Sequence, residues 1–136
     1  MSQDFYLGNP NLKKVGTEIQ FTKHQIQEYL KCKEDPVYFA MNYIKIISLD
    51  EGIVPFNMWD FQQELIESFH EHRFNIAKLP RQTGKSTTCV SYLLHYILFN
   101  DNVNVGILAN KLSTARDLLS RLQLAYEQLP LWIQQG

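Results

Sequence analysis

The stretch KLPRQTGKST, residues 78–87, decides how the second half of this chain is interpreted. A phosphate-binding Walker A loop has the pattern Gly, four residues, Gly, Lys, and then Ser or Thr. Gly84 and the two residues after it fit this pattern, but Leu79 stands where the first glycine is expected. The second glycine lets backbone approach a phosphate closely, and Pro80 could make the bend that the first glycine normally makes. The loop therefore keeps the parts on which phosphate binding depends.

The segments around this loop have the composition of alternating strands and helices. FNIAKL (74–79) is a short apolar run that enters the loop, and TTCVSYLLHYILFN (87–100) has apolar residues at helical spacing. VNVGILA (103–109) is a second apolar run, typical of a parallel strand buried on both faces. KLSTARDLLSRLQLAYEQL (111–129) then has one apolar helix face. This order predicts a doubly wound parallel α/β sheet.

The first half of the chain has a different character. Residues 1–20 show little periodicity and predict an extended arm. Residues 21–72 predict a helical lead-in. Thr22 can cap its first helix, KHQIQEYLKCKED (23–35), and the lead-in ends with the helix MWDFQQELIESFHEH (58–72). We therefore expect an N-terminal helical segment followed by residues 73–136, the first βαβα part of an incomplete P-loop NTPase domain. A parallel sheet of two strands cannot cover its own edges, so we expect the front part of a larger ATPase.

A Walker A loop binds phosphate mainly through backbone N–H groups at the start of a helix. Lys85 is expected to reach the β and γ phosphate oxygens, and the Ser86 hydroxyl is expected to be a ligand of Mg²⁺. The predicted cofactors are ATP and Mg²⁺. The candidate cofactor-binding residues of the loop are Gln82, Thr83, Gly84, Lys85, Ser86 and Thr87. The alternative interpretation of the motif is an ordinary helix start with a solvated lysine.

The stretch IKIISLDEG (44–52) resembles a Walker B strand. Such a strand would hold Mg²⁺ through Asp50 and position water with Glu51. In phosphate-loop folds this strand follows the loop, whereas here it precedes the loop. A polar turn between two helices is therefore the preferred interpretation. No other apolar run ending in two acids follows Ser86, so the chain is expected to lack parts needed for hydrolysis.

Three stretches together resemble the N-terminal part of the large terminase subunit, the DNA-packaging motor of T-even-like tailed bacteriophages. The resemblance covers about residues 11–136. LPRQTGKST (79–87) resembles the deviant Walker A motif of that family, in which a non-glycine residue holds the first position. WDFQQELI (59–66) resembles its adenine-recognition motif. VGILANKLSTARDLLSRL (105–122) resembles the strand and helix that follow the loop.

The resemblance implies roles for single residues. Arg81 would be the catalytic residue, an arginine finger from the same chain that stabilises charge on the γ phosphate. Gln62 would read the adenine edge, and Lys85 and Ser86 would bind phosphates and Mg²⁺. Judged without the resemblance, Gln62 is an ordinary exposed helix residue and Arg81 is a surface or phosphate-binding cation.

The resemblance also implies partners and a location. The partners would be double-stranded DNA, the portal and the small terminase subunit, with a ring oligomer at full length. The location would be the host cytoplasm and, transiently, the procapsid, but not the mature virion. Composition alone does not indicate DNA binding, because the net charge is −1. No apolar run approaches the roughly 20 residues of a membrane span, so no membrane partner is expected.

Two other functions stay open on the sequence. A helicase-like or restriction-type DNA translocase shares the combination of an upstream glutamine and a Walker A loop. A non-catalytic nucleotide-binding or interaction module is the second alternative, and it predicts a stable monomer without an exposed strand edge.

Overall fold

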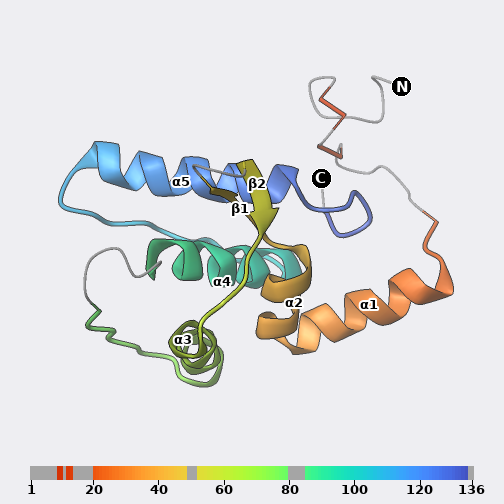
Figure 1. Cartoon of the computed structure of the whole chain (residues 1–136), viewed down its shortest axis with the longest axis horizontal. Coiled ribbons are helices and arrows are strands. Elements are labelled where there is room, and N and C mark those ends of the chain that lie inside the picture. Colours follow the sequence, from red (N-terminus) through yellow and green to blue (C-terminus); the bar gives the residue numbers. More distant parts are fainter. Residues whose placement is uncertain (1–8, 11, 14–19, 49–51, 80–84, 135–136) are drawn as a thin grey trace.

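Helices dominate the computed structural model of the chain (Figure 1). The structure describes residues 9–10, 12–13, 20–48, 52–79 and 85–134. Within these residues the elements are, in chain order, α1 (Lys23–Glu34), α2 (Pro36–Tyr43), β1 (Lys45–Ser48), β2 (Gly52–Pro55), α3 (Asp60–Glu71), α4 (Lys85–Phe99) and α5 (Leu112–Glu127).

The sheet found within the described residues is an antiparallel hairpin of two strands, β1 and β2. Lys45 pairs with Pro55, and Ser48 pairs with Gly52. The prediction of a doubly wound parallel α/β sheet, as in an incomplete P-loop NTPase domain, is therefore wrong. The βαβα order expected for residues 73–136 contains the two helices α4 and α5 but not the two parallel strands.

The two segments predicted as parallel strands, 74–79 and 103–109, belong to no strand. Several of their apolar side chains face solvent, since Phe74 is 83% exposed, Ile76 is 102% exposed and Leu108 is 98% exposed. In the part of the chain that the structure describes, no backbone hydrogen bond joins either segment to a neighbour. A strand exists only through hydrogen bonds to a neighbouring strand, so apolar composition was not sufficient for this prediction.

The hairpin also changes the interpretation of residues 44–52. This stretch was expected to be a polar turn, but it contains β1 and the first residue of β2. Gly52 has a φ of 77°, a left-handed conformation that glycine adopts without steric cost. Asp50 and Glu51 lie outside the described residues.

The start of α1 is fixed by a capping box. The Gln25 N–H donates to Thr22 Oγ1 at 3.2 Å, and the Thr22 N–H donates to Gln25 Oε1 at 3.0 Å. These two contacts satisfy backbone donors that have no partner inside the helix. The helix expected to start after Thr22 is thus confirmed.

The break between α1 and α2 follows from Asp35 and Pro36. A residue before proline is disfavoured in the helical conformation, and Asp35 has φ −126° and ψ 100°. The Asp35 carboxylate then caps α2 by accepting from the N–H groups of Val37 at 3.0 Å and Tyr38 at 3.2 Å. Proline is well suited to the first helical position, where its missing N–H costs nothing.

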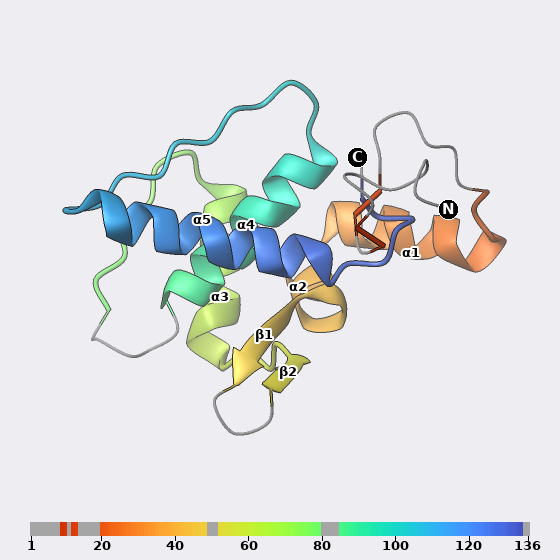
Figure 2. The same ribbon diagram turned by 90° about the horizontal axis from the view of Figure 1, so that it is seen from above.

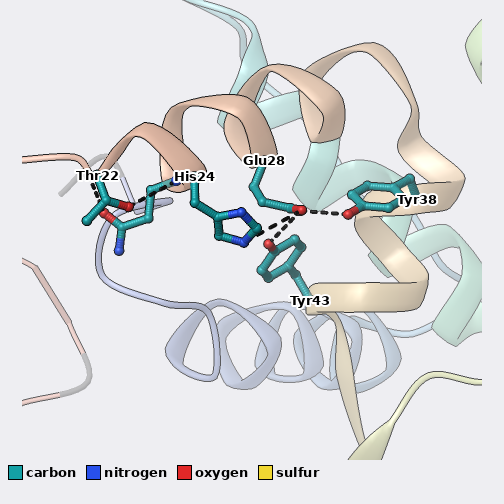
Figure 3. Close-up of polar contacts among 6 residues, drawn as sticks. Thr22, His24, Glu28, Tyr38 and Tyr43 are labelled. Carbon is teal, nitrogen blue, oxygen red and sulfur yellow. Dashed lines mark hydrogen bonds and ion pairs between the residues drawn. The ribbon is translucent and has the colours of Figure 1, made fainter.

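Glu28 of α1 holds α1 and α2 together (Figure 3). Its Oε2 accepts hydrogen bonds from the hydroxyls of Tyr38 at 2.7 Å and Tyr43 at 2.9 Å, while His24 Nε2 lies 4.0 Å from Oε1. The hydrogen bond from Tyr38, followed by that from Tyr43, lowers the pKa of the Glu28 carboxyl. Donation to Glu28 raises the pKa of Tyr38 to about 12. Both phenols therefore remain protonated donors at neutral pH.

The core lies where α4 meets α2, α3 and α5. Its largest fully buried side chains include Phe39 of α2, Ile66 of α3 and Leu94 of α4. The buried apolar residues of this cluster are Cys32, Phe39, Ala40, Ile44, Phe56, Ile66, Leu94, Leu98, Phe99, Ala125, Leu129 and Ile133. Figure 2 shows that α5 crosses α4 at a steep angle and that a long extended segment connects the end of α4 to the start of α5. Helix α4 therefore packs against three other helices, α2, α3 and α5.

His95 of α4 lies inside this core and is 2% exposed. Its Nε2 is 2.8 Å from the carbonyl oxygen of Cys32, so Nε2 carries the proton and donates it. The Cys32 carbonyl is one of the last four in α1, which have no acceptor role inside the helix. His95 thus caps the end of α1 from another helix, and burial lowers the pKa of its imidazole.

Two further properties concern the whole described chain. No helix among the described residues is long and apolar enough to span a membrane. Neither Cys32 nor Cys89 forms a disulfide in the part of the chain that the structure describes. Burial raises the pKa of Cys32 to about 12, so this thiol stays protonated and is a poor nucleophile.

Candidate functional site

The candidate phosphate loop ends where α4 begins. Lys85 is the first residue of α4, directly after the Gly84 position of the motif. Arg81, Gln82, Thr83 and Gly84 lie outside the described residues. The first N–H groups of a helix have no partner inside the helix and carry a partial positive charge. The motif therefore stands at a helix start, as a phosphate loop requires.

The residues after Lys85 differ in exposure. Ser86 and Thr87 are half-buried, whereas Thr88 is fully buried. A half-buried hydroxyl can still reach a ligand, so Ser86 fits its expected role toward Mg²⁺ better than Thr88 would. No group of three or more His, Cys, Asp or Glu side chains within the described residues could hold a metal ion.

A cavity of about 300 Å³ lies beside the first turn of α4. Thr87, the last residue of the candidate motif, is part of its wall. The residues that line it come from the start of β1, from α4 and from α5, and they are Ile44, Lys45, Ile46, Thr87, Val90, Arg121, Leu124 and Ala125. Sequence reasoning missed Lys45 and Arg121, because each looks like a solvated charge within its own segment.

Gln62, the candidate adenine-reading residue, is 5% exposed and lies in the first turn of α3. Its Oε1 accepts a hydrogen bond from the Trp59 N–H at 2.9 Å. The amide oxygen thus helps to cap α3, and Gln62 is not the exposed helix residue expected without the resemblance. Gln62 is not among the described residues that line the cavity at Thr87, although α3 and α4 are in contact.

Aromatic side chains flank Gln62. Trp59 is 64% exposed, and its ring centroid lies 5.7 Å from that of Phe61. A flat ligand could stack on such an exposed indole. The Gln62 side chain is itself buried, and Trp59 stands three residues before it in the chain.

A second, wider cavity of about 900 Å³ lies between the end of α3, α4 and the extended chain near Gly106. His70 and Tyr92 are both in its wall, and His70 Nδ1 is 3.3 Å from the Tyr92 hydroxyl. Sequence reasoning missed this cluster because its residues come from three separate stretches.

No protein-family model matches the chain, so the resemblance to the large terminase subunit rests on the sequence stretches alone.

Proposed function

We propose that this chain binds Mg·ATP at residues 78–87 and is the ATP-binding front part of a phage terminase large subunit. In that role its ATPase would drive DNA translocation into the procapsid. The observation that carries the proposal is that Lys85 and Ser86, which follow Gly84 in the sequence, form the start of α4, a helix of 15 residues. A Gly-Lys-Ser sequence that leads into a helix is the arrangement that phosphate binding uses.

The binding mode follows from the chemistry of the motif. Backbone N–H groups of residues 82–86 would donate to the phosphates, and the positive end of α4 would add to their stabilisation. The Lys85 ammonium would pair with the β and γ phosphates, and the Ser86 hydroxyl would join the Mg²⁺ ligands. Arg81 would stabilise the charge that develops on the γ phosphate during hydrolysis.

Adenine would be recognised near the start of α3. Trp59 offers an exposed ring, and the Gln62 amide lies in the same helix turn. Because Gln62 Oε1 accepts from the Trp59 N–H, adenine binding would replace that capping contact. Under this proposal, the full-length protein would form a ring in the host cytoplasm. That ring would contact double-stranded DNA, the portal and the small terminase subunit.

The alternative is a nucleotide-binding module that does not hydrolyse ATP. The absence of a metal-binding acidic group among the described residues favours this alternative. Exposed apolar side chains in residues 74–79 and 103–109 count against a stand-alone module, since such surface usually contacts another chain or segment. Measured phosphate release separates the two, because the module would bind Mg·ATP and release none.

The direct test of nucleotide binding is the substitution Lys85→Ala. Loss of a charged contact to two phosphates is expected to raise the Kd for Mg·ATP by about 100-fold, because each charged hydrogen bond contributes about 1.5–3 kcal/mol. Isothermal titration calorimetry measures this Kd, and far-UV circular dichroism checks that α4 is intact.

A matched control is Lys111→Ala. Lys111 also stands at a helix start, as the N-cap of α5, but it is exposed and has no phosphate-loop sequence before it. Its substitution is expected to leave the Kd unchanged. If the Lys85→Ala protein bound Mg·ATP as tightly as the parent, the assignment of the site would be wrong.

A further inference from the structure

The cavity beside Thr87 has an apolar part and a polar part. Five of its lining residues are apolar, namely Ile44, Ile46, Val90, Leu124 and Ala125. The other three are Lys45, Thr87 and Arg121, which bring two cations and a hydroxyl. Its volume of about 300 Å³ lies at the lower end of the range for small-molecule sites, which combine apolar walls with a few placed polar groups.

The three polar residues of the lining come from three different elements. Lys45 is the first residue of β1, Thr87 lies in the first turn of α4 and is the last residue of the candidate motif, and Arg121 lies in α5. The cavity therefore brings two cations from outside the motif to the same wall as a hydroxyl of the motif.

The two cations are available to a ligand. Arg121 is paired with Asp117, with 3.3 Å between Arg121 Nη2 and Asp117 Oδ2, and their side chains are 53% and 61% exposed. A solvent-exposed ion pair of this kind contributes little to stability, so the guanidinium can turn to a ligand at low cost. Lys45 is exposed at the start of β1. A guanidinium binds phosphate through two parallel hydrogen bonds, which gives Arg121 the stronger expected contact.

We propose that this cavity is a subsite for the bound nucleotide, in which Arg121 and Lys45 bind the phosphates from outside the Walker A loop. The inference rests on the proposed function and adds two residues that the motif does not contain. The phosphate chain lies against Thr87, Lys45 and Arg121, and the apolar residues form the rest of the wall.

The test compares Arg121→Gln and Lys45→Gln with the parent chain. Arg121→Gln is expected to raise the Kd for Mg·ATP by about 10-fold, the equivalent of one charged hydrogen bond. Lys45→Gln is expected to have a smaller effect of the same sign. Arg121→Lys keeps the charge and is expected to recover part of the affinity. Adenosine, which has no phosphate, is expected to bind the parent and Arg121→Gln equally.

Arg116→Gln is the matched control. Arg116 lies on the same helix, carries the same charge and is exposed, but it does not line the cavity. Its substitution is expected to leave the Kd unchanged. The thermal midpoint of each variant shows whether the fold is retained, and the recovery by Arg121→Lys separates a charge effect from a folding effect.

Each remaining outcome decides one claim. If Lys85→Ala weakens binding while Arg121→Gln and Lys45→Gln bind like the parent, the subsite is wrong and the proposed function stands. If Arg121→Gln and Arg116→Gln weaken binding equally, the effect is one of net charge and the subsite is wrong. If the parent chain binds no Mg·ATP, the proposed function fails and the subsite fails with it.

Discussion

Replacing Phe39 with alanine is expected to lower the free energy of unfolding by about 3–5 kcal/mol. Phe39 is completely buried, and its ring centroid lies 5.6 Å from that of His95 and 5.5 Å from that of Phe99. The substitution removes a large apolar side chain from the contact between α2 and α4 and leaves a cavity there. Since small domains have only about 5–15 kcal/mol of stability in total, the variant should unfold at much lower urea concentration.

The matched control for this prediction is Phe74→Ala. The chemical change is the same, but Phe74 is 83% exposed and lies in an extended segment. Its substitution is expected to change stability by less than about 0.5 kcal/mol. Urea unfolding followed by circular dichroism measures both variants. Equal shifts for the two would show that the core does not lie at the contact between α2 and α4.

The second large effect concerns His95 and pH. Replacing His95 with leucine is expected to cost about 1–3 kcal/mol at pH 7.5, because the Cys32 carbonyl loses its buried donor. Burial lowers the folded-state pKa of His95 below the ordinary value of 6.5. The unfolded chain therefore binds the proton first as the pH falls. The contribution of His95 to the free energy of unfolding is therefore complete above pH 6.5, and it is lost as the pH falls through the pKa of the folded state.

Unfolding curves between pH 7.5 and pH 5.5 test this prediction. The parent chain is expected to lose stability across this range, and His95→Leu is expected to lose less. His72→Leu is the control, because it also removes a histidine, but one whose side chain is exposed. A His95→Leu protein with the same pH dependence as the parent would show that another group titrates.

The helices were predictable because their signals are local. A helix satisfies its backbone groups within its own residues, so spacing and caps suffice to place it. The predicted helix at 87–100 corresponds to α4, Lys85–Phe99, and the one at 111–129 corresponds to α5, Leu112–Glu127. Thr22 was correctly identified as a cap.

The strands were not predictable from the same kind of signal. Residues 74–79 and 103–109 have the composition of buried strands, but within the described chain no neighbour pairs with them. The hairpin of β1 and β2 was missed because residues 44–52 were interpreted as a turn between helices. A strand depends on a partner elsewhere in the chain, and composition does not show whether that partner is in reach.

The candidate site likewise contains residues that the sequence could predict and residues that it could not. Lys85 and Ser86 are placed at a helix start by a local motif, which the sequence displays directly. Lys45 and Arg121 share a cavity only because β1, α4 and α5 meet there, and no pattern within either segment indicates this. The burial of Gln62 likewise depends on how α3 packs, which a resemblance of eight residues does not specify.

Hydrogen–deuterium exchange of the backbone with and without Mg·ATP tests the central claim most directly. If the phosphates accept hydrogen bonds from backbone N–H groups, Mg·ATP must slow the exchange of amides in residues 80–87, and Lys85→Ala must remove that protection. Slower exchange around Arg121 in the same experiment would support the subsite. Exchange that is unchanged in residues 80–87 at saturating Mg·ATP would contradict nucleotide binding at this loop.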